Sequence, residues 1–284
     1  MKCGAMKLPS GASLDFKGPT LVMAVVNCNE DSFYAPSRAL LDNAVEKALV
    51  AEEEGASIVD FGGESTRPGS SYISGEEELE RVIPVIRAFR RRSTLPVSVD
   101  TRKAAVARAA LDAGADIIND ISALSHDSRM AEVCAGAGAA VVLAHMKGNP
   151  LTMQQGRIFY ADPVAEVGSY LKAAAERAMA AGIKRDRIII DPGFGFGKRF
   201  NDNLAILRGL ARLAEICGND YPVLVGLSRK SFVGELTGRD TAPERLAGTL
   251  AANAAAIMGG AAIIRVHDAG EHADLVKALF ALRP

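Results

Sequence analysis

Short apolar runs rich in β-branched residues recur along the whole chain. Each is followed by polar or glycine-rich residues and then by a stretch with helical periodicity. The runs are continuously apolar rather than alternating, which is typical of parallel strands buried on both faces. The pattern predicts a strand at each of eight places, residues 21–26, 57–61, 96–99, 116–118, 140–143, 187–190, 223–225 and 262–266.

The stretches between these runs carry signals of helix ends. Ser74 followed by Glu77 indicates a capping box at the start of one helix. Pro84 lies inside the same helical pattern and is expected to kink or break it. Glycines also fall where helices should end before the next strand, namely Gly55, Gly114, Gly138 and Gly182.

Strands that alternate with helices predict a parallel sheet. Eight units within about 250 residues favour a closed barrel over an open doubly wound sheet. The predicted fold class is therefore α/β, a (β/α)8 TIM barrel. No linker or change of composition divides the chain, so we expect a single domain over residues 1–284 with a barrel core of about residues 20–282. The short N-terminal segment before the first strand is a candidate to cap the barrel floor.

The composition excludes several classes of protein. The chain has 33 Lys and Arg against 34 Asp and Glu, which argues against a nucleic-acid binder with a broad basic surface. The apolar stretch 247–264 is interrupted by Thr249 and Asn253, so no membrane span is expected. No signal peptide is recognisable. The cysteines lack disulfide or zinc-site spacing, which favours a reducing, cytoplasmic location (Cys3, Cys28, Cys134 and Cys217).

Polar side chains follow all eight predicted strands. In such a barrel the chemistry lies at the carboxyl ends of the strands, whereas the opposite end serves stability. Single residues allow plainer interpretations: Asp100 is equally well a helix cap, and the glycines of 193–198 fit neither a P-loop nor a dinucleotide motif. His126 and His272 are expected at the surface, and His145 is left undecided. The concentration of polar groups at one end of the strands still predicts a binding site there.

Residues at these tips indicate the chemistry of the ligand. Lys230 and Ser231 follow the seventh strand, and Arg265 and His267 end the eighth. Barrels commonly bind phosphate at these two loops, and Ser231 opens a helix whose free N–H groups attract anions. The tips of three other strands suit a flat heterocycle rich in N–H donors, with Asp100, Asn119 and Asp191. We therefore expect a flat polar ring deep in the barrel mouth and an acidic tail near its rim.

Four motifs follow one another in the chain: Asp60-x-Gly-Gly-Glu-Ser-Thr-Arg-Pro-Gly69, Asp191-Pro-Gly-Phe-Gly-Phe-Gly-Lys198, Ser228-Arg-Lys-Ser-Phe232 and Arg265-Val-His-Asp268. With them the chain resembles the dihydropteroate synthase family of folate biosynthesis, from Thr20 to about Leu282. The resemblance implies a pterin-binding transferase that joins 6-hydroxymethyl-7,8-dihydropterin diphosphate to 4-aminobenzoate and releases pyrophosphate. It also implies Mg²⁺ as cofactor and sulfonamides as inhibitors.

The resemblance further assigns roles to positions of this chain. Arg265 would stack on the pterin ring and help to hold the diphosphate, and Asn27 would bind Mg²⁺. The residues implied as catalytic are Arg265, His267, Lys230 and Asn27. The pterin diphosphate would be held by Thr66, Asp100, Asn119, Asp191, Lys230, Arg265, Val266 and His267. The 4-aminobenzoate would be held by Phe33, Arg67, Pro68, Phe196 and Ser231.

The chain departs from the family pattern in three places: Asn29-Glu30 replaces Thr-Pro, Ala35-Pro36-Ser37-Arg38 replaces a Gly-Gly segment, and Arg199 replaces Thr. Two alternatives therefore stay open. One is a methyltransferase that passes a methyl group from methyltetrahydrofolate to a corrinoid protein, which should lack the Ser-Thr-Arg-Pro and Ser-Arg-Lys-Ser loops. The other is a non-catalytic pterin-binding paralogue. By analogy with the family we expect a homodimer, with neither nucleic acid nor membrane as partner.

Overall fold

The computed structural model describes residues 4–28, 38–65, 70, 72–148, 153 and 158–283. Its centre is an eight-stranded parallel sheet in the order β8-β7-β6-β5-β4-β3-β10-β9. A parallel bridge between Ile190 and Val223 brings the two ends of this sheet together, so the predicted barrel fold is confirmed. The strands are β3 (Leu21–Asn27), β4 (Ile58–Gly62), β5 (Val97–Asp100), β6 (Ile117–Asp120), β7 (Ala140–Ala144), β8 (Ile188–Asp191), β9 (Leu224–Val225) and β10 (Ile263–Val266).

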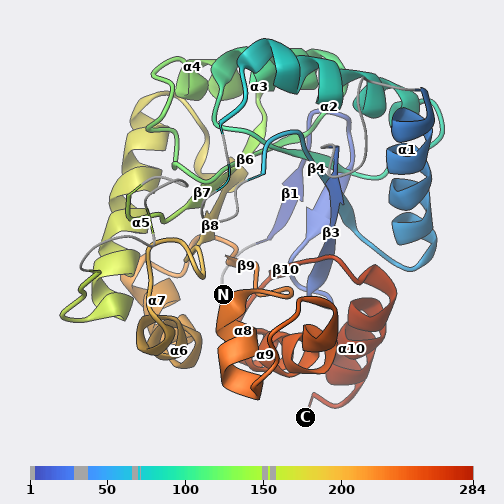
Figure 1. Ribbon diagram of the computed structural model, residues 1–284. Coiled ribbons are helices and arrows are strands. Elements are labelled where there is room, and N and C mark those ends of the chain that lie inside the picture. Colours follow the sequence, from blue (N-terminus) through green and yellow to red (C-terminus); the bar gives the residue numbers. More distant parts are fainter. Residues whose placement is uncertain are drawn as a thin grey trace.

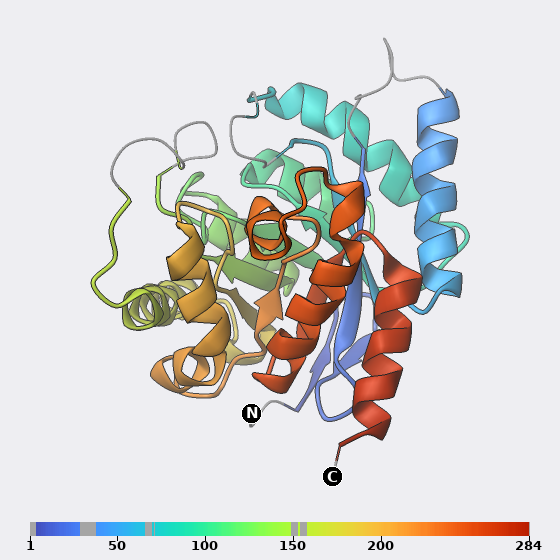
Figure 2. The ribbon, with the colours of Figure 1, turned by 60° about the horizontal axis from the view of Figure 1, so that its bottom comes forward.

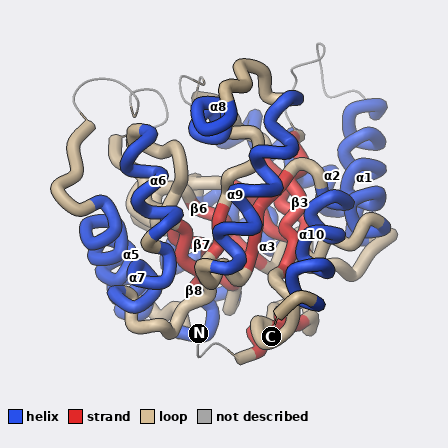
Figure 3. Tube along the Cα trace, turned by 90° about the horizontal axis from the view of Figure 1, so that it is seen from below, coloured by secondary structure: helices blue, strands red, loops and turns tan. Residues whose placement is uncertain are grey.

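Helices surround this barrel in chain order, as the colours of Figure 1 show. Figure 3 shows the strands inside and the helices outside, and Figure 2 shows both ends of the chain on one side of the molecule. The α-helices are α1 (Arg38–Glu53), α2 (Gly75–Arg90), α3 (Ala104–Asp112), α4 (Met130–Ala137), α5 (Pro163–Ala180), α6 (Phe200–Arg208), α7 (Leu210–Ile216), α8 (Ser231–Thr237), α9 (Leu246–Met258) and α10 (Ala269–Ala281). None of them, in the part of the chain described, is long and apolar enough to cross a membrane.

The N-terminal segment forms an antiparallel hairpin of β1 (Ala5–Lys7) and β2 (Ser13–Asp15). Met6, Leu8 and Leu14 of this segment are buried in one apolar cluster with residues from the beginnings of the barrel strands. Those strand residues include Met23, Ile58, Ile117, Ala140, Ile189, Leu224 and Ile263. The hairpin therefore closes the barrel floor, as the sequence suggested, and leaves the carboxyl ends of the strands for the site.

Most of the predicted helix ends are found in place. All four singled-out glycines have positive φ, between +63° and +106°, which a residue with a side chain adopts only at a cost. The hydroxyl oxygen of Ser74 accepts a hydrogen bond from the Glu77 N–H at 3.1 Å, as expected of an N-cap. These ends set the length of each helix, and with it the point at which the next strand begins.

The helix break expected at Pro84 and the surface position expected for His272 are both wrong. Pro84 does not break α2, which continues to Arg90: the exposed proline ring points away from a buried face that includes Val82 and Phe89 on either side of it. Packing of that face outweighs the lost backbone hydrogen bond. His272 is buried rather than at the surface, and its Nδ1 lies 2.6 Å from the Asp268 carbonyl oxygen one helical turn earlier. His126 is exposed, as expected.

Candidate active site

The predicted ring-binding side chains come from three strand ends at the barrel mouth. Asp100 ends β5, Asn119 is its register partner in β6, and Asp191 ends β8. All three side chains are buried. Side chains alternate along a strand, so the residue two places earlier points the same way, into the barrel. In β6 and β8 those residues, Ile117 and Ile189, belong to the apolar floor, and the polar groups form the next layer above it.

Arg265 of β10 joins two of the carboxylates across the barrel. Its Nε donates to Asp60 Oδ2 at 2.6 Å, and its Nη2 donates to Asp100 Oδ2 at 3.0 Å. Asp60 Oδ2 also accepts from Asn119 Nδ2 at 3.2 Å. The other oxygen of the fully buried Asp60, Oδ1, has no hydrogen-bond partner among the described residues. This arrangement fixes the guanidinium of Arg265 and the amide of Asn119 around one carboxylate.

Sequence reasoning gave Asp60 no role, although it begins one of the motifs. A usable signal existed, because Asp60 lies two residues after Ile58 in a strand that is otherwise apolar. Period-two alternation places the two side chains on the same face of β4. A carboxylate on that face, above the floor, has to find a cation, and Arg265 is the cation that the fold supplies.

Burial shifts the protonation of the mouth residues. Loss of hydration raises the pKa of Asp100 to about 7; Arg265 opposes the shift, and the nearby charge of Asp60 adds to it. Burial likewise raises the pKa of Asp191, against the attraction of Lys230. Removal from water lowers the pKa of Lys230 to about 8, against the attraction of Asp191. The mouth therefore holds groups whose charge responds to a ligand and to pH near neutrality.

The glycine-rich loop after β8 packs tightly on the end of β7. A Cβ on Gly193 would lie 2.0 Å from the His145 carbonyl oxygen, and one on Gly197 would lie 2.3 Å from the Lys147 carbonyl oxygen. Both glycines also have positive φ. Only glycine fits at these two positions. The loop is thus a close-packed turn rather than a phosphate-binding loop.

Lys198 holds this loop from inside, a role that the sequence did not reveal. Its buried Nζ donates to the carbonyl oxygens of Gly193 at 2.8 Å and of Phe196 at 3.2 Å, and it lies 2.9 Å from His145 Nδ1. Burial, with the charge of Lys198, lowers the pKa of His145 to about 3. His145 is therefore a neutral partner of Lys198, which decides the question left open for this residue.

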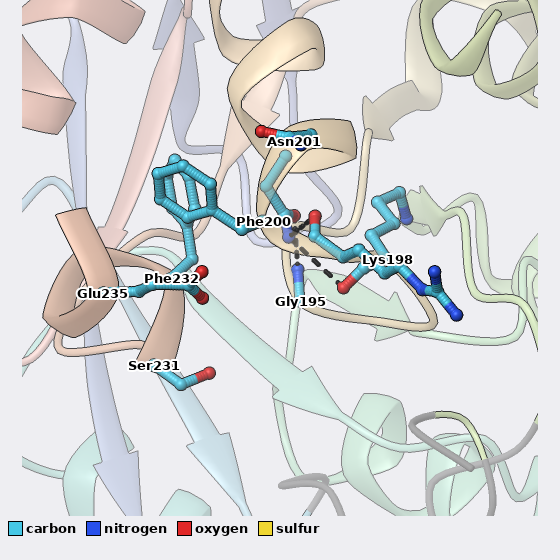
Figure 4. A pocket seen from close by; sticks show the side chains of 9 residues that line it. Gly195, Lys198, Phe200, Asn201, Ser231, Phe232 and Glu235 are labelled. Atoms are coloured by element: carbon cyan, nitrogen blue, oxygen red, sulfur yellow. Dashed lines mark hydrogen bonds between the residues drawn. The ribbon is translucent and has the colours of Figure 1, made fainter. Parts of the chain in front are cut away.

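Lys230 links the loop to α8. Its Nζ donates to the Phe194 carbonyl oxygen and lies 4.4 Å from the centre of the Phe196 ring. Ser231 begins α8 and borders a cavity of about 510 Å³ between α6 and α8 (Figure 4). Phe200 and Phe232 form one wall of this cavity, with ring centres 5.5 Å apart. The cavity is also lined by Gly195, Lys198, Arg199, Asn201, Asn203 and Glu235.

The end of β10 is tied to the loop that follows β9. The Ser228 hydroxyl lies 3.0 Å from His267 Nδ1 and accepts from the His267 backbone N–H at 3.2 Å. Arg229 donates to both oxygens of Asp268, from Nη2 to Oδ1 and from Nε to Oδ2 at 3.0 Å. The loop that carries Lys230 is therefore joined to the residues that directly follow β10, the strand of Arg265.

Comparison with known proteins agrees with this geometry. The model of the family described as "Pterin binding enzyme" matches residues 23–267. The dihydropteroate synthase of Escherichia coli is 45% identical over 277 residues, which cover 96% of this chain and 95% of that protein. The enzyme of Synechocystis is 41% identical, covering 97% and 94%. The chain belongs to the dihydropteroate synthase family.

Solved structures of this family have the same fold. A Xanthomonas albilineans dihydropteroate synthase with 4-aminobenzoic acid is 42% identical, with a TM-score of 0.90 and complete coverage of both chains. The same enzyme in complex with 7,8-dihydropteroate gives a TM-score of 0.86 at 39% identity, covering 99% of this chain and 100% of that one. A Yersinia pestis dihydropteroate synthase with a sulfonamide drug complex gives 0.90 at 39%, covering 98% of both chains.

The structure gathers most, but not all, of the residues expected from the dihydropteroate synthase motifs. Asn27 ends β3 and is exposed at the mouth, and Phe196 is half-buried below Lys230. Val266 packs in the apolar layer between strands and helices, so its side chain does not line the mouth. The remaining predicted residues lie outside the described residues (Phe33, Thr66, Arg67 and Pro68).

The predicted magnesium ligand Asn27 lies at the mouth. Among the described residues no three His, Cys, Asp or Glu side chains form a metal-binding group. Mg²⁺ does not need such a cage, because it is commonly held by one or two carboxylates, waters and the phosphates of a substrate. The amide oxygen of Asn27 is a donor of the required hard type.

Proposed function

We propose that this chain condenses 6-hydroxymethyl-7,8-dihydropterin diphosphate with 4-aminobenzoate to give 7,8-dihydropteroate and pyrophosphate. The observation that carries the proposal is the layer of buried Asp100, Asn119 and Asp191 with half-buried Arg265 above the apolar barrel floor. The family membership supports the same activity. Structures of the Xanthomonas albilineans relative hold 4-aminobenzoic acid and 7,8-dihydropteroate.

The ring edge of the pterin would bind to the acceptors of this layer. An ionised Asp191 can accept two parallel N–H bonds from the aminopyrimidine edge, and such charge-assisted pairs are stronger than neutral ones. Asn119 can donate and accept, which suits a ring edge with mixed groups. The attraction of nearby Asp191 reduces the free energy needed to bury the charged form of Lys230. Binding of the ring would therefore replace water at groups that are already held in place.

The reaction breaks the bond between the exocyclic methylene and the diphosphate oxygen. The positive charge left on the methylene is stabilised by the electron-rich pterin, and Arg265 and His267 would neutralise the departing diphosphate. Magnesium, when bound at Asn27, would supply further charge neutralisation for that leaving group. The amine of 4-aminobenzoate attacks in its neutral form, so a bond to nitrogen forms and a proton leaves to water. No strong general base is needed.

The 4-aminobenzoate would lie beside Phe196 with its carboxylate toward Ser231. Lys230 contacts the ring of Phe196, and Ser231 borders the cavity between α6 and α8 (Figure 4). The pterin site and this position are joined through Lys230, which faces both. The amine would then point toward the methylene of the pterin, the geometry required for attack. We also propose that Phe33, Thr66, Arg67 and Pro68 complete the two substrate sites, as in the family pattern.

Further properties belong to the same proposal. The chain would act as one pterin-binding domain over residues 1–284 and use Mg²⁺. It would be cytoplasmic and would form a homodimer through its late helices. The region of α9 is rich in small residues, which permit the close approach of a second helix.

The test is turnover by the purified protein. With pterin diphosphate, 4-aminobenzoate and Mg²⁺, we expect pyrophosphate release that requires both substrates and that a sulfonamide inhibits in competition with 4-aminobenzoate. Absence of release would contradict the proposal. Pterin binding without release would indicate a non-catalytic paralogue, and methyl transfer from methyltetrahydrofolate to a corrinoid protein would indicate the methyltransferase.

A further inference from the structure

A second cluster of buried charges lies beside the site and has no role in the proposed reaction. Lys103 Nζ donates to Glu78 Oε2 at 2.5 Å and also to Glu64 Oε2. Arg102 Nη2 donates to the other Glu64 oxygen at 2.7 Å. The four side chains are each no more than 11% exposed. We call the set of Glu64, Glu78, Arg102 and Lys103 the charge network.

The charge network connects the ends of two neighbouring strands with one helix. Glu64 follows β4, Glu78 lies in the first turn of α2, and Lys103 is the N-cap of α3 after β5. The end of β4 is also pressed against α2, because a Cβ on Gly63 would lie 2.7 Å from a methyl group of Val82. Arg81 of α2 donates to the Gly63 carbonyl oxygen at 3.0 Å. The two strand ends are thus fixed relative to each other.

These strand ends carry the two carboxylates that hold Arg265. Asp60 precedes Glu64 by four residues, and Asp100 precedes Lys103 by three. Arg265 bonds both carboxylates with two atoms of one rigid guanidinium. Because the separation of those atoms is fixed, the two carboxylates must keep a matching separation. A change in the distance between the ends of β4 and β5 would therefore break one of the two bonds.

Stability alone is a weak explanation for such a network. The free energy needed to remove charges from water is about as large as the free energy gained by ion pairing. Buried ion pairs therefore often contribute little or nothing to folding. One reason to retain them is that they fix a specific geometry. The network also differs from a surface ion pair in that each Glu64 oxygen has its own cationic partner. Burial of the ion pairs and a separate partner for each Glu64 oxygen are both expected of residues that hold two strand ends at a fixed separation.

We propose that Glu64, Glu78 and Lys103 are positioning residues that set the separation of Asp60 and Asp100, and through it the orientation of Arg265 toward the pterin diphosphate. The proposal rests on the proposed function, since it concerns the same substrate. The three side chains act through the two aspartates. Their loss should therefore weaken pterin binding much more than aminobenzoate binding.

The test compares two double variants. Lys103→Met with Glu78→Gln removes both ion pairs of Lys103 and leaves Glu64 paired with Arg102. Arg90→Met with Asp116→Asn removes a buried ion pair of similar length, 2.6 Å, at the barrel floor. Calorimetry with pterin diphosphate and Mg²⁺ gives Kd, turnover gives the KM for 4-aminobenzoate, and thermal unfolding gives Tm.

For the network variant we expect Kd to rise about ten- to hundred-fold and kcat to fall, because small misplacements of binding groups are costly. The KM for 4-aminobenzoate should change less than about two-fold. The floor variant should lower Tm at least as much while Kd stays within about two-fold. A network variant with lowered Tm and unchanged Kd would show a purely structural role and overturn the proposal.

A milder substitution covers the case in which the double variant does not fold. Glu64→Gln keeps the size of the side chain and should raise Kd in the same direction by a smaller factor, whereas an unchanged Kd overturns the proposal. Failure of the proposed function looks different, because the unmodified protein would then release no pyrophosphate. If that protein still binds pterin diphosphate, the Kd comparison decides the positioning role, and if it does not bind, both proposals are wrong.

Discussion

Buried Asp116 at the barrel floor and buried Asp60 at the mouth differ in how many of their oxygen atoms accept hydrogen bonds. At the floor, Asp116 Oδ1 accepts from the Ser10 N–H at 3.0 Å, and its Oδ2 accepts from Val97 N–H and from Arg90 at 2.6 Å. At the mouth, Asp60 and Asp100 share the guanidinium of Arg265, and Asp60 Oδ1 lacks a partner among the described residues. Both ends bury charge, but both oxygens of Asp116 accept hydrogen bonds, whereas Asp60 keeps one oxygen without a partner among the described residues.

The number of unused acceptor atoms distinguishes a carboxylate that stabilises the fold from one that can bind a ligand. A buried carboxylate with all its acceptors used contributes to a rigid structure and has nothing left for a ligand. A carboxylate with spare acceptors is costly in the free protein and can recover that cost when a ligand with N–H donors binds. Substitutions at the floor should therefore change the free energy of unfolding, and substitutions at the mouth should change affinity.

The largest expected effect is at the floor. Arg90→Met leaves Asp116 buried without its cation and should lower the free energy of unfolding by about 3–5 kcal/mol. Urea denaturation measures this change. At a temperature where the variant is folded, kcat/KM for both substrates should stay within about two-fold of the unmodified protein. A selective rise in the pterin KM would contradict the separation of the two ends.

At the mouth, Asp191→Ala should abolish most pterin binding with the fold intact. Two charge-assisted hydrogen bonds are lost, worth about 3 kcal/mol or more together, which weakens binding at least about 100-fold. Calorimetry measures the affinity, and circular dichroism checks the fold. Asp191→Asn keeps one acceptor and should retain part of the affinity. An unchanged Kd in the alanine variant would remove Asp191 from the ring site.

The N-terminal hairpin allows a second test of the floor that involves no charged residue. Leu14 is buried at the floor, so Leu14→Ala should lower the free energy of unfolding by about 2–3 kcal/mol, near the lower end for buried leucines. Chemical denaturation measures it. The pterin Kd should not move, because the apolar layer beneath the site contains several other side chains. Weakened pterin binding in this variant would show that the floor transmits strain to the mouth.

Per unit of pH, the change in stability is smaller than the effects above, at most about 1.4 kcal/mol for each proton. Asp100 has a pKa of about 7, above its unfolded value of about 3.9, so the folded state binds more protons in this window. The free energy of unfolding should therefore fall as pH rises from about 4 to 7. Urea titrations at several pH values measure the slope, and Asp100→Asn should remove this contribution.

Lys230 should act in the opposite direction at higher pH. Its pKa of about 8 lies below the unfolded value of about 10.4, so the unfolded state binds more protons between these values. The free energy of unfolding should rise with pH across that window, and Lys230→Met should flatten the rise. The contribution of Lys230 is the difference in slope between the unmodified protein and the Lys230→Met variant. If this difference shows stability falling with pH, Lys230 is more hydrated than the structure indicates.

Much of the fold and part of the site could be predicted from the chain alone. Continuous apolar runs reveal strands buried on both faces, and the residues that follow them are the groups found at the mouth, such as Asp100 and Asp191. The helix break predicted at Pro84 was wrong because local propensity was outweighed by a buried helix face. The surface position predicted for His272 was wrong because no sequence neighbour shows that α10 turns this residue inward.

The sequence by itself determined the order of strands and helices and the polar residues that follow the strands at one end of the barrel. These follow from short-range periodicity, since turns, caps and alternation are local properties. The tertiary structure alone decided which charges meet: Arg265 with Asp60, Lys198 with His145, and Lys103 with Glu64 and Glu78. Each of these pairs is separated by at least 25 residues, so only closure of the barrel brings its members together.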